Sequence, residues 1–389
     1  MSAASGARAR EILAQLVGFA TPSHASNLDL IAWVEGLLAA AGAQVRRLPA
    51  PCGTKAGLYA AVGPGQGGVL LSAHSDVVPV EGQSWTRAPW QLQHDQGRFW
   101  GRGVTDMKGF LAQAIAALER GAASPLGQRL ALVLSYDEEV GCVGLHQMMP
   151  ALRPLLGQPE LVIVGEPTGM LPGLAHKGKA AFQLRFRGQA GHSALAPQFT
   201  NALHPAVDFV QAMRALQAEL AQGHAPGTEK GAEITYPTLH IGRLQGGRAL
   251  NLVPELAEID MELRHPAACD VKSILSKMKQ AAAQAVVPFG AGAQVEMEER
   301  FRYPAFEVAA AGAEVALARS LADAGLGAGL RLSYGTEAGY FAQEGLACVV
   351  MGPGEMARDG HQPDEGLDVA QFDACGAMMA RILARLGAA

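Results

Sequence analysis

The sequence predicts an α/β protein in which a mostly parallel central sheet is interrupted by a smaller inserted domain. Short apolar runs alternate with helical patterns in the first part of the chain, strands of alternating polarity replace them in the middle, and the α/β pattern returns near the end. The length of 389 residues suggests two or three domains. A hydrophobic share of 49% against 17% charged residues provides enough apolar material for a large core.

The strands of the first domain are expected at apolar runs that polar residues follow. These runs are residues 68–72 (GVLLS), 130–135 (LALVLS) and 161–165 (LVIVG). Helices are expected at residues 107–118, where apolar residues recur at helical spacing, and at residues 143–152. The N-terminal segment also has an amphipathic helical pattern, instead of the apolar core of a signal peptide.

The middle of the chain has a different rhythm and predicts a separate module. A strand, a helix, two strands, a helix and a strand are expected at residues 181–187, 206–220, 238–242, 256–263, 271–286 and 293–297. This βαββαβ order is that of a ferredoxin-like fold. The α/β pattern then resumes with a helix, two strands and a helix at residues 308–322, 330–333, 347–351 and 369–386. We therefore expect a large domain from residues 1–179 and 298–389, and an inserted domain from residues 180–297.

Composition excludes several classes of protein. Lys and Arg total 31 and Asp and Glu total 36, which gives a net charge of −5, and no basic run offers a nucleic-acid footprint. No apolar stretch reaches the roughly 20 residues that a membrane helix needs. The cysteines form no C-x-x-C pair, so we expect buried free thiols and a cytoplasmic location: Cys52, Cys142, Cys269, Cys348 and Cys375.

Polar residues gather where open α/β sheets place their active sites, just after the apolar runs or beside a helix start. The set comprises His74, Asp76, Asp106, Glu138, Glu139, Glu166 and His361. Each member alone has an ordinary interpretation: His74 as a core histidine, Asp106 as a helix N-cap, or Glu138 as part of a solvated acidic pair. Glu166 and His361 could be ordinary loop residues. All members of the set, however, lie at the same kind of position relative to the predicted strands and helices, and this favours a common site.

Imidazole and carboxylate donors without thiolates suit zinc, cobalt or manganese. Two such ions roughly 3.5–4 Å apart need a bridging carboxylate. Two divalent ions are neutralised by three carboxylates and a hydroxide, which leaves one carboxylate free to act as a base. The residues therefore predict a dinuclear hydrolytic centre. The H-E-x-x-H motif of helix-based zinc proteases is absent.

These segments, in order, resemble the signature blocks of the co-catalytic zinc amidohydrolases, a family that includes acetylornithine deacetylases, succinyl-diaminopimelate desuccinylases, aminoacylases and glutamate carboxypeptidases. The matching segments lie at residues 74–76, 101–109, 137–139, 165–168, 191–193 and 361. The resemblance spans nearly the whole chain and implies two divalent metals, zinc with cobalt as the alternative. It implies that His74 and Glu166 bind one metal, that Glu139 and His361 bind the other, and that Asp106 bridges them.

The resemblance also implies roles around the metals. A metal-bridging hydroxide attacks the acyl carbonyl, with Glu138 as general base and Asp76 orienting His74 through its ring N–H. His192, from the inserted domain, would stabilise the oxyanion, often across a subunit boundary, which implies a homodimer and a role of that domain as a lid. Without the resemblance, His192 could equally be a surface turn histidine. A cis peptide bond between Asp106 and Met107 is a further implied feature.

The resemblance implies a small N-acyl amino acid substrate. Asn251 and Arg264 match positions that hold the substrate carboxylate, although a turn asparagine and a surface arginine are the alternatives. Gly335, Thr336 and Glu337 are more similar to the acetylornithine deacetylase branch, where an acid at Glu337 would read the ornithine ammonium. That branch releases acetate and ornithine in arginine biosynthesis. The alternatives are a succinyl-diaminopimelate desuccinylase, a broader N-acyl amino acid hydrolase and a non-catalytic binding protein on the same fold.

Overall fold

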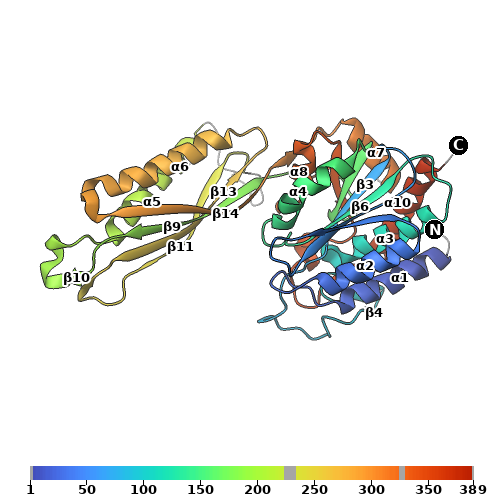
Figure 1. Cartoon of the computed structure of the whole chain (residues 1–389), viewed down its shortest axis with the longest axis horizontal. Helices are drawn as coiled ribbons and strands as arrows, with labels where there is room; N and C mark the ends of the chain where they lie inside the picture. The colour runs from blue at the N-terminus through green and yellow to red at the C-terminus, as the bar shows by residue number, and fades with distance from the viewer. Residues whose placement is uncertain (1–2, 223–233, 324–328, 388–389) are drawn as a thin grey trace. The chain divides into compact units, whose positions relative to one another are not determined.

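The structure is a computed structural model of the chain, and it describes residues 3–222, 234–323 and 329–387. The chain folds into two compact units. Met1–His176 and Phe306–Ala389 form the large domain, and Lys177–Ala305 form the inserted domain. Figure 1 labels many of the elements of both domains.

The large domain is built around a nine-stranded sheet. Its order is β1-β2-β6-β3-β7-β17-β8-β15, with β16 paired to β8. The central strands β6, β3, β7 and β17 are parallel, and antiparallel pairs lie toward both edges, which confirms the predicted fold class. The strands are β1 (Gln44–Pro49), β2 (Ala56–Val62), β3 (Val69–His74), β6 (Leu130–Ser135), β7 (Leu161–Pro167), β8 (Gly173–His176), β15 (Phe306–Glu307), β16 (Leu330–Leu332) and β17 (Cys348–Gly352).

Helices cover both faces of this sheet, which explains why its central strands read as unbroken apolar runs. One face packs into a continuous core with α1 (Ala3–Gly18), α2 (Leu28–Ala40), α3 (Gly109–Ala122), α7 (Ala313–Ala322) and α10 (Val369–Leu386). The other face carries α4 (Val143–Leu156) and α8 (Ala338–Gln343), whose His146 and Tyr340 rings are in contact. The short helix α9 (Met356–Asp359), the helical turn η1 (Val104–Lys108) and a small sheet of β4 (Gln93–Asp95), β5 (Arg98–Trp100) and β18 (Gly366–Asp368) complete the domain.

The inserted domain is a four-stranded antiparallel sheet with two helices on one face (Figure 1). The sheet order β11-β13-β9-β14 and the chain order βαββαβ are those of a ferredoxin-like fold. Its main elements are β9 (Gly178–Arg187), α5 (Leu203–Leu220), β11 (Thr238–Gly246), β13 (Leu256–His265), α6 (Val271–Val286) and β14 (Gln294–Tyr303). Two short strands, β10 (Gly191–His192) and β12 (Leu252–Val253), pair at one end, beside the turns η2 (Ser193–Gln198) and η3 (Val287–Gly292).

Most predicted elements coincide with observed ones, and the differences have physical causes. The helix predicted at residues 308–322 begins only at Ala313, because the backbone N–H of Val308 donates to the carbonyl of Leu174 at 2.8 Å and continues the pairing of β15 with β8. The first and last strands of the inserted domain extend beyond the predicted limits, since β9 begins at Gly178 and β14 ends at Tyr303. All five cysteines are free, but Cys52 is exposed and Cys269 is only half-buried, so the prediction of buried thiols is confirmed at the other three positions and wrong at Cys52. Among the described residues, no helix combines the length and apolarity that a membrane crossing requires.

Candidate metal centre

The predicted site residues of the large domain converge at one edge of its sheet. His74 is the last residue of β3, Glu166 lies near the end of β7, and Glu138 and Glu139 follow β6. Because these three strands are parallel neighbours, their carboxyl ends meet at the same edge. Asp106 lies in the turn η1, and His361 follows α9 on the segment after β17.

Asp106 stands at the centre of this cluster, between two imidazole rings. Its Oδ1 is 3.1 Å from Nε2 of His74, and its Oδ2 is 3.4 Å from Nε2 of His361. The outer partners are Glu166, 3.8 Å from His74 Nε2, and Glu139, 3.0 Å from His361 Nε2. A carboxylate with one oxygen toward each histidine has the arrangement that a bridging ligand needs. The peptide bond from Asp106 to Met107 is cis, as the resemblance implied.

The geometry argues against the ordinary interpretations of several residues. Asp106 does not cap α3, because the N-cap position belongs to Lys108. Glu138 and the Glu139 carboxylate are buried, so they are not a solvated pair. His361 remains 48% exposed, although its ring reaches two carboxylates.

Burial and mutual repulsion dominate the electrostatics. Burial raises the pKa of Glu139 to about 7, and the charge of Asp106 adds to this effect. Burial likewise raises the pKa of Glu138 and of Glu166 well above the ordinary value. Burial also acts to raise the pKa of Asp106, but hydrogen bonds from His361 and His74 outweigh it and hold that pKa below its ordinary value. The cluster therefore concentrates negative charge that a cation could neutralise.

The donor set fits divalent metal ions. Oε1 of Glu139 and Oε1 of Glu166 are buried and have no hydrogen-bond partner, an arrangement that is costly unless something else binds them. Ligand atoms of His74, Asp106 and Glu139, and those of His74, Glu138 and Glu166, lie within 4.8 Å of one another. The ring N–H at Nδ1 of His74 donates to the backbone carbonyl of Asp76 at 2.8 Å, which leaves Nε2 free to bind a metal.

Asp76 lies beside this cluster, but its backbone carbonyl, and not its carboxylate, accepts the ring N–H of His74. That carboxylate is 3.7 Å from His74 Nδ1, whereas the backbone carbonyl of the same residue is the closer partner of the ring. Its two oxygens accept the backbone N–H groups of Glu138 at 3.1 Å and Glu139 at 3.3 Å, and the hydroxyl of Ser23 at 2.7 Å. Asp76 therefore fixes the backbone that presents both glutamates.

The loop before α8 places two predicted substrate residues in the interior. Thr336 is fully buried, and its Oγ1 lies 3.1 Å from Nε2 of His176. Glu337 is 1% exposed and accepts a hydrogen bond from the hydroxyl of Ser72 at 3.1 Å, while its Oε1 has no partner. Gly335 precedes them on the same loop. Burial is the main cause of the raised pKa of Glu138, and the charge of Glu337 adds to it, so Glu337 lies close to the cluster.

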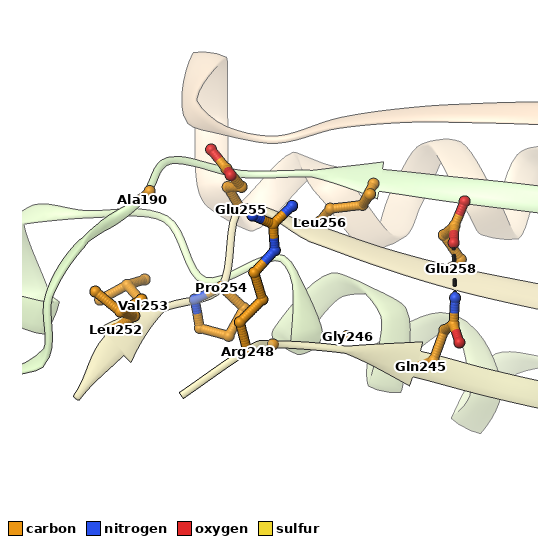
Figure 2. A pocket seen from close by; sticks show the side chains of 11 residues that line it. Ala190, Gln245, Gly246, Arg248, Leu252, Val253, Pro254, Glu255, Leu256 and Glu258 are labelled. Atoms are coloured by element: carbon orange, nitrogen blue, oxygen red, sulfur yellow. Dashed lines mark hydrogen bonds between the residues drawn. The ribbon is translucent and has the colours of Figure 1, made fainter. Parts of the chain in front are cut away.

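The remaining predicted residues lie in the inserted domain. His192 and Asn251 are exposed and close together, because β10 pairs with β12 and the N–H of Ser193 donates to the carbonyl of Asn251 at 3.1 Å. A pocket of about 480 Å³ adjoins them, lined by Arg248, Leu252 and nine other residues (Figure 2). Arg264 lies elsewhere on this domain, on β13, where its Nε donates to Glu262 at 2.7 Å.

Two buried residues of the large domain lie at the site but were not predicted from the sequence. Arg102 and Glu365 are each 1% exposed and form an ion pair of 2.9 Å close to the turn that carries Asp106. Both lie near predicted metal ligands in the sequence: Arg102 is in the glycine-rich segment 101–109 that contains Asp106, and Glu365 is four residues after His361. Their closeness to these ligands is the sequence signal that could have identified them as candidate site residues.

A buried cluster of two imidazoles and several carboxylates around a central aspartate, at the carboxyl edge of an α/β sheet, defines a candidate metallohydrolase centre. The chain belongs to peptidase family M20/M25/M40, whose model matches residues 70–385. It is 32% identical over 390 residues to an acetylornithine deacetylase from Myxococcus xanthus, with 96% of each chain covered. This membership makes the protein a hydrolase and confirms the family that the sequence resembles.

Solved structures of low sequence identity share the fold. A tripeptidase from Staphylococcus aureus superposes with a TM-score of 0.75 at 17% identity, covering 98% of each chain. A dinuclear metal-binding peptidase of the M20 family from Bacillus subtilis gives a TM-score of 0.67 at 18% identity, covering 99% of each chain. The arrangement of a large domain with an inserted domain is therefore common to proteins of very different sequence.

The pKa shifts predict that the metal-free protein loses stability as pH rises. The pKa of Glu139 is raised by burial from 4.5 to about 7, so the folded protein keeps a proton that the unfolded chain has released. This stabilisation is complete below about pH 4.5 and disappears as pH rises through 7. Hydrogen bonds to Asp106 and Glu139 raise the pKa of His361 from 6.5 to about 10, which extends the loss to higher pH. We expect the Tm of chelated protein to fall by several degrees between about pH 5.5 and pH 8.

Differential scanning fluorimetry with and without added zinc measures this effect. Zinc should raise the Tm more at the higher pH, because ligation requires deprotonated donors. The matched control is Glu139→Gln without metal, whose Tm should depend less on pH. A chelated wild-type protein that becomes more stable over this interval would contradict the assignment.

Proposed function

We propose that this chain is an N²-acetyl-L-ornithine deacetylase, which hydrolyses a linear amide to acetate and L-ornithine. The observation that carries the hydrolytic chemistry is the Asp106 carboxylate with one oxygen toward each of two histidines. The substrate is supported by the relative from Myxococcus xanthus and by the segment around Glu337.

In this proposal His74 and Glu166 hold one divalent ion, Glu139 and His361 hold the other, and Asp106 bridges them. The distances support this division, since Glu166 lies beside His74 and Glu139 lies beside His361. Zinc is the proposed metal, with cobalt as the alternative, because the donors are imidazole and carboxylate without thiolate. When bound, the two ions would lower the pKa of a water molecule and polarise the acyl carbonyl.

Glu138 is the proposed general base. Its buried carboxylate accepts a hydrogen bond from the Cys142 thiol at 3.2 Å, and Asp76 holds its backbone N–H. The raised pKa of Glu138, caused mainly by burial, makes its carboxylate a better proton acceptor. After taking a proton from water, Glu138 can pass it to the leaving amine. His192 is the proposed donor to the oxyanion.

Asn251 and Arg264 are proposed to bind the α-carboxylate of the substrate. The Arg264 guanidinium is suited to this role because its planar fork can bind a carboxylate through two hydrogen bonds. Its side chain is 35% exposed, and its ion pair with Glu262 uses Nε. We propose that the two terminal nitrogens of Arg264, Nη1 and Nη2, bind the substrate carboxylate.

Glu337 is proposed to select for the side-chain ammonium of ornithine. In Glu337→Gln, we expect the ratio of kcat/KM for N²-acetyl-L-ornithine to that for N-acetyl-L-methionine to fall at least about tenfold, since an ion pair becomes a neutral hydrogen bond. The control is Glu355→Gln, which alters an acid elsewhere in the large domain. An unchanged ratio together with a lowered Tm would show that this buried acid is structural and would remove it from the specificity site.

The acyl group separates this proposal from its neighbours in the family. Acetate release from N²-acetyl-L-ornithine should exceed succinate release from N-succinyl-L,L-diaminopimelate by at least about 10²-fold in kcat/KM, since two different acyl pockets are required. The reverse ratio would favour a desuccinylase, and similar rates on many N-acetyl amino acids would favour a broad amidase. Absence of any hydrolysis by metal-loaded protein would favour a binding protein.

We further propose a place in arginine biosynthesis, a cytoplasmic location and a homodimer formed through the inserted domain. The free thiols are in line with a reducing compartment. Exposed apolar side chains on the inserted domain support an interface there: Leu195, Leu244, Leu250 and Leu252.

A further inference from the structure

We propose that Glu365, held by Arg102, is a positioning residue that assembles the half of the metal centre containing His361. This inference rests on the proposed metal centre and deepens it, because neither Glu365 nor Arg102 is a ligand in that proposal. The two side chains are 1% exposed each, and Arg102 Nη1 donates to Glu365 Oε2 at 2.9 Å. A buried ion pair needs further hydrogen bonds to be stable, so its other partners indicate what it holds.

The Glu365 carboxylate holds the turn that presents Asp106. Its Oε2 accepts the backbone N–H of Gly103 at 2.9 Å, and its Oε1 accepts those of Thr105 at 2.9 Å and Asp106 at 3.0 Å. The hydroxyl of Thr105 donates to the carbonyl of Gly366 at 2.8 Å. The backbone of the proposed bridging ligand is therefore fixed by the segment that also carries His361.

Arg102 holds the backbone around His361. Its Nη1 donates to the carbonyl of Gln362 at 3.2 Å, and its Nη2 donates to the side chain of Gln83. The amide of Gln83 in turn donates to the carbonyl of His361 at 2.8 Å. His361 has a φ of 61°, a left-handed conformation that a non-glycine residue keeps only where its surroundings support it.

The two halves of the centre do not depend equally on this network. His74 is fixed within the sheet by β3 and through its ring by the carbonyl of Asp76. His361 lies outside any strand and is 48% exposed. Loss of the Glu365 charge should therefore loosen His361 and the Oδ2 side of Asp106, and leave the His74 side in place.

The test is a calorimetric titration with cobalt(II) of full-length protein from which a chelator has removed all metal. The visible d–d absorption of the bound cobalt is recorded at each step of a parallel titration. Wild type should show two binding events. In Glu365→Gln, which keeps the shape but not the charge, one event should weaken at least about tenfold, the loss that is typical when a group supporting a ligand is removed. The other event should stay within about twofold, so that the d–d spectrum retains a single component at equimolar cobalt.

The matched control is Asp359→Asn. Asp359 lies on the same segment, two residues before His361, whereas Glu365 lies four residues after it. Asp359 is 5% exposed, but it pairs with Arg98 at 2.7 Å instead of Arg102. It should keep two events of wild-type affinity. If Glu365→Gln fails to fold, Arg102→Lys retains the charge and loses the fork, and should weaken the same event by a smaller factor.

Two cobalt events of wild-type affinity in Glu365→Gln, or in Arg102→Lys where that variant is used, would overturn the inference. An equal loss in Asp359→Asn would also overturn it, because the effect would then be a general loosening of the segment. Failure of the wild-type protein to bind two ions is a different result, since it would contradict the proposed metal centre itself. The inference and the proposed function therefore fail in distinguishable ways.

Discussion

Replacement of Glu138 by glutamine is expected to lower kcat by about 10²–10⁴-fold, the contribution of a positioned general base. The side chain keeps its size, so the contacts with Cys142 and the backbone held by Asp76 can persist. Glutamine has no carboxylate to accept the proton of water, whereas burial raises the pKa of Glu138 and makes its carboxylate a stronger base. KM should change little, because Glu138 is not proposed to bind the substrate.

Metal content distinguishes this role from ligation. Glu138 lies within ligand distance of His74 and Glu166, so the geometry alone would also allow it to bind an ion. We expect Glu138→Gln to retain two metals per chain by elemental analysis, with Glu160→Gln, an exposed acid paired to Arg385, as the control for activity. A variant that loses one metal would show that Glu138 is a ligand and that another group acts as base.

Replacement of Asp106 by asparagine is expected to have the most severe effect on the centre. Asp106 is the residue whose two oxygens face the two histidines, and asparagine offers one oxygen and an amide nitrogen that does not ligate. We expect bound metal to fall from two ions per chain to one or none. Activity should fall by at least about 10³-fold, because several kcal/mol of charge stabilisation depend on both ions.

Elemental analysis and steady-state rates measure both effects in the same preparation. Asp95→Asn is the control, since Asp95 is exposed and paired with Arg87 on the small sheet. Its metal content and kcat should equal those of wild type. An Asp106→Asn protein that keeps two tightly bound ions would exclude a bridging role, whatever its activity.

The central strands and the edge that carries the site could be predicted from local sequence. A strand buried on both faces reads as an unbroken apolar run, and β6 begins and ends at the predicted residues. The same holds for α10, whose apolar stripe has helical spacing throughout. Because parallel strands share one carboxyl edge, the sequence alone predicts that the residues after these runs lie together.

Features that depend on contacts distant in sequence could not be predicted. Before α7, Phe306 pairs with β8 and the N–H of Val308 donates to the carbonyl of Leu174, contacts that the apolar pattern from residue 308 does not reveal. The burial of Glu337 depends on Ser72, 265 residues away. Glu365 binds a turn about 260 residues earlier in the chain, so its acidic side chain alone gave no indication of its partners. The ligand roles came from the family resemblance, since each residue alone had an ordinary alternative.

Release of free L-ornithine from N²-acetyl-L-ornithine tests the central claim most directly. The purified protein is assayed after loading with zinc, after treatment with a chelator, and after zinc is restored. We predict rapid release that disappears with the chelator and returns with the metal, in a preparation that binds two ions per chain. Release that persists in fully metal-free protein, or no release from protein loaded with two ions, would contradict the account.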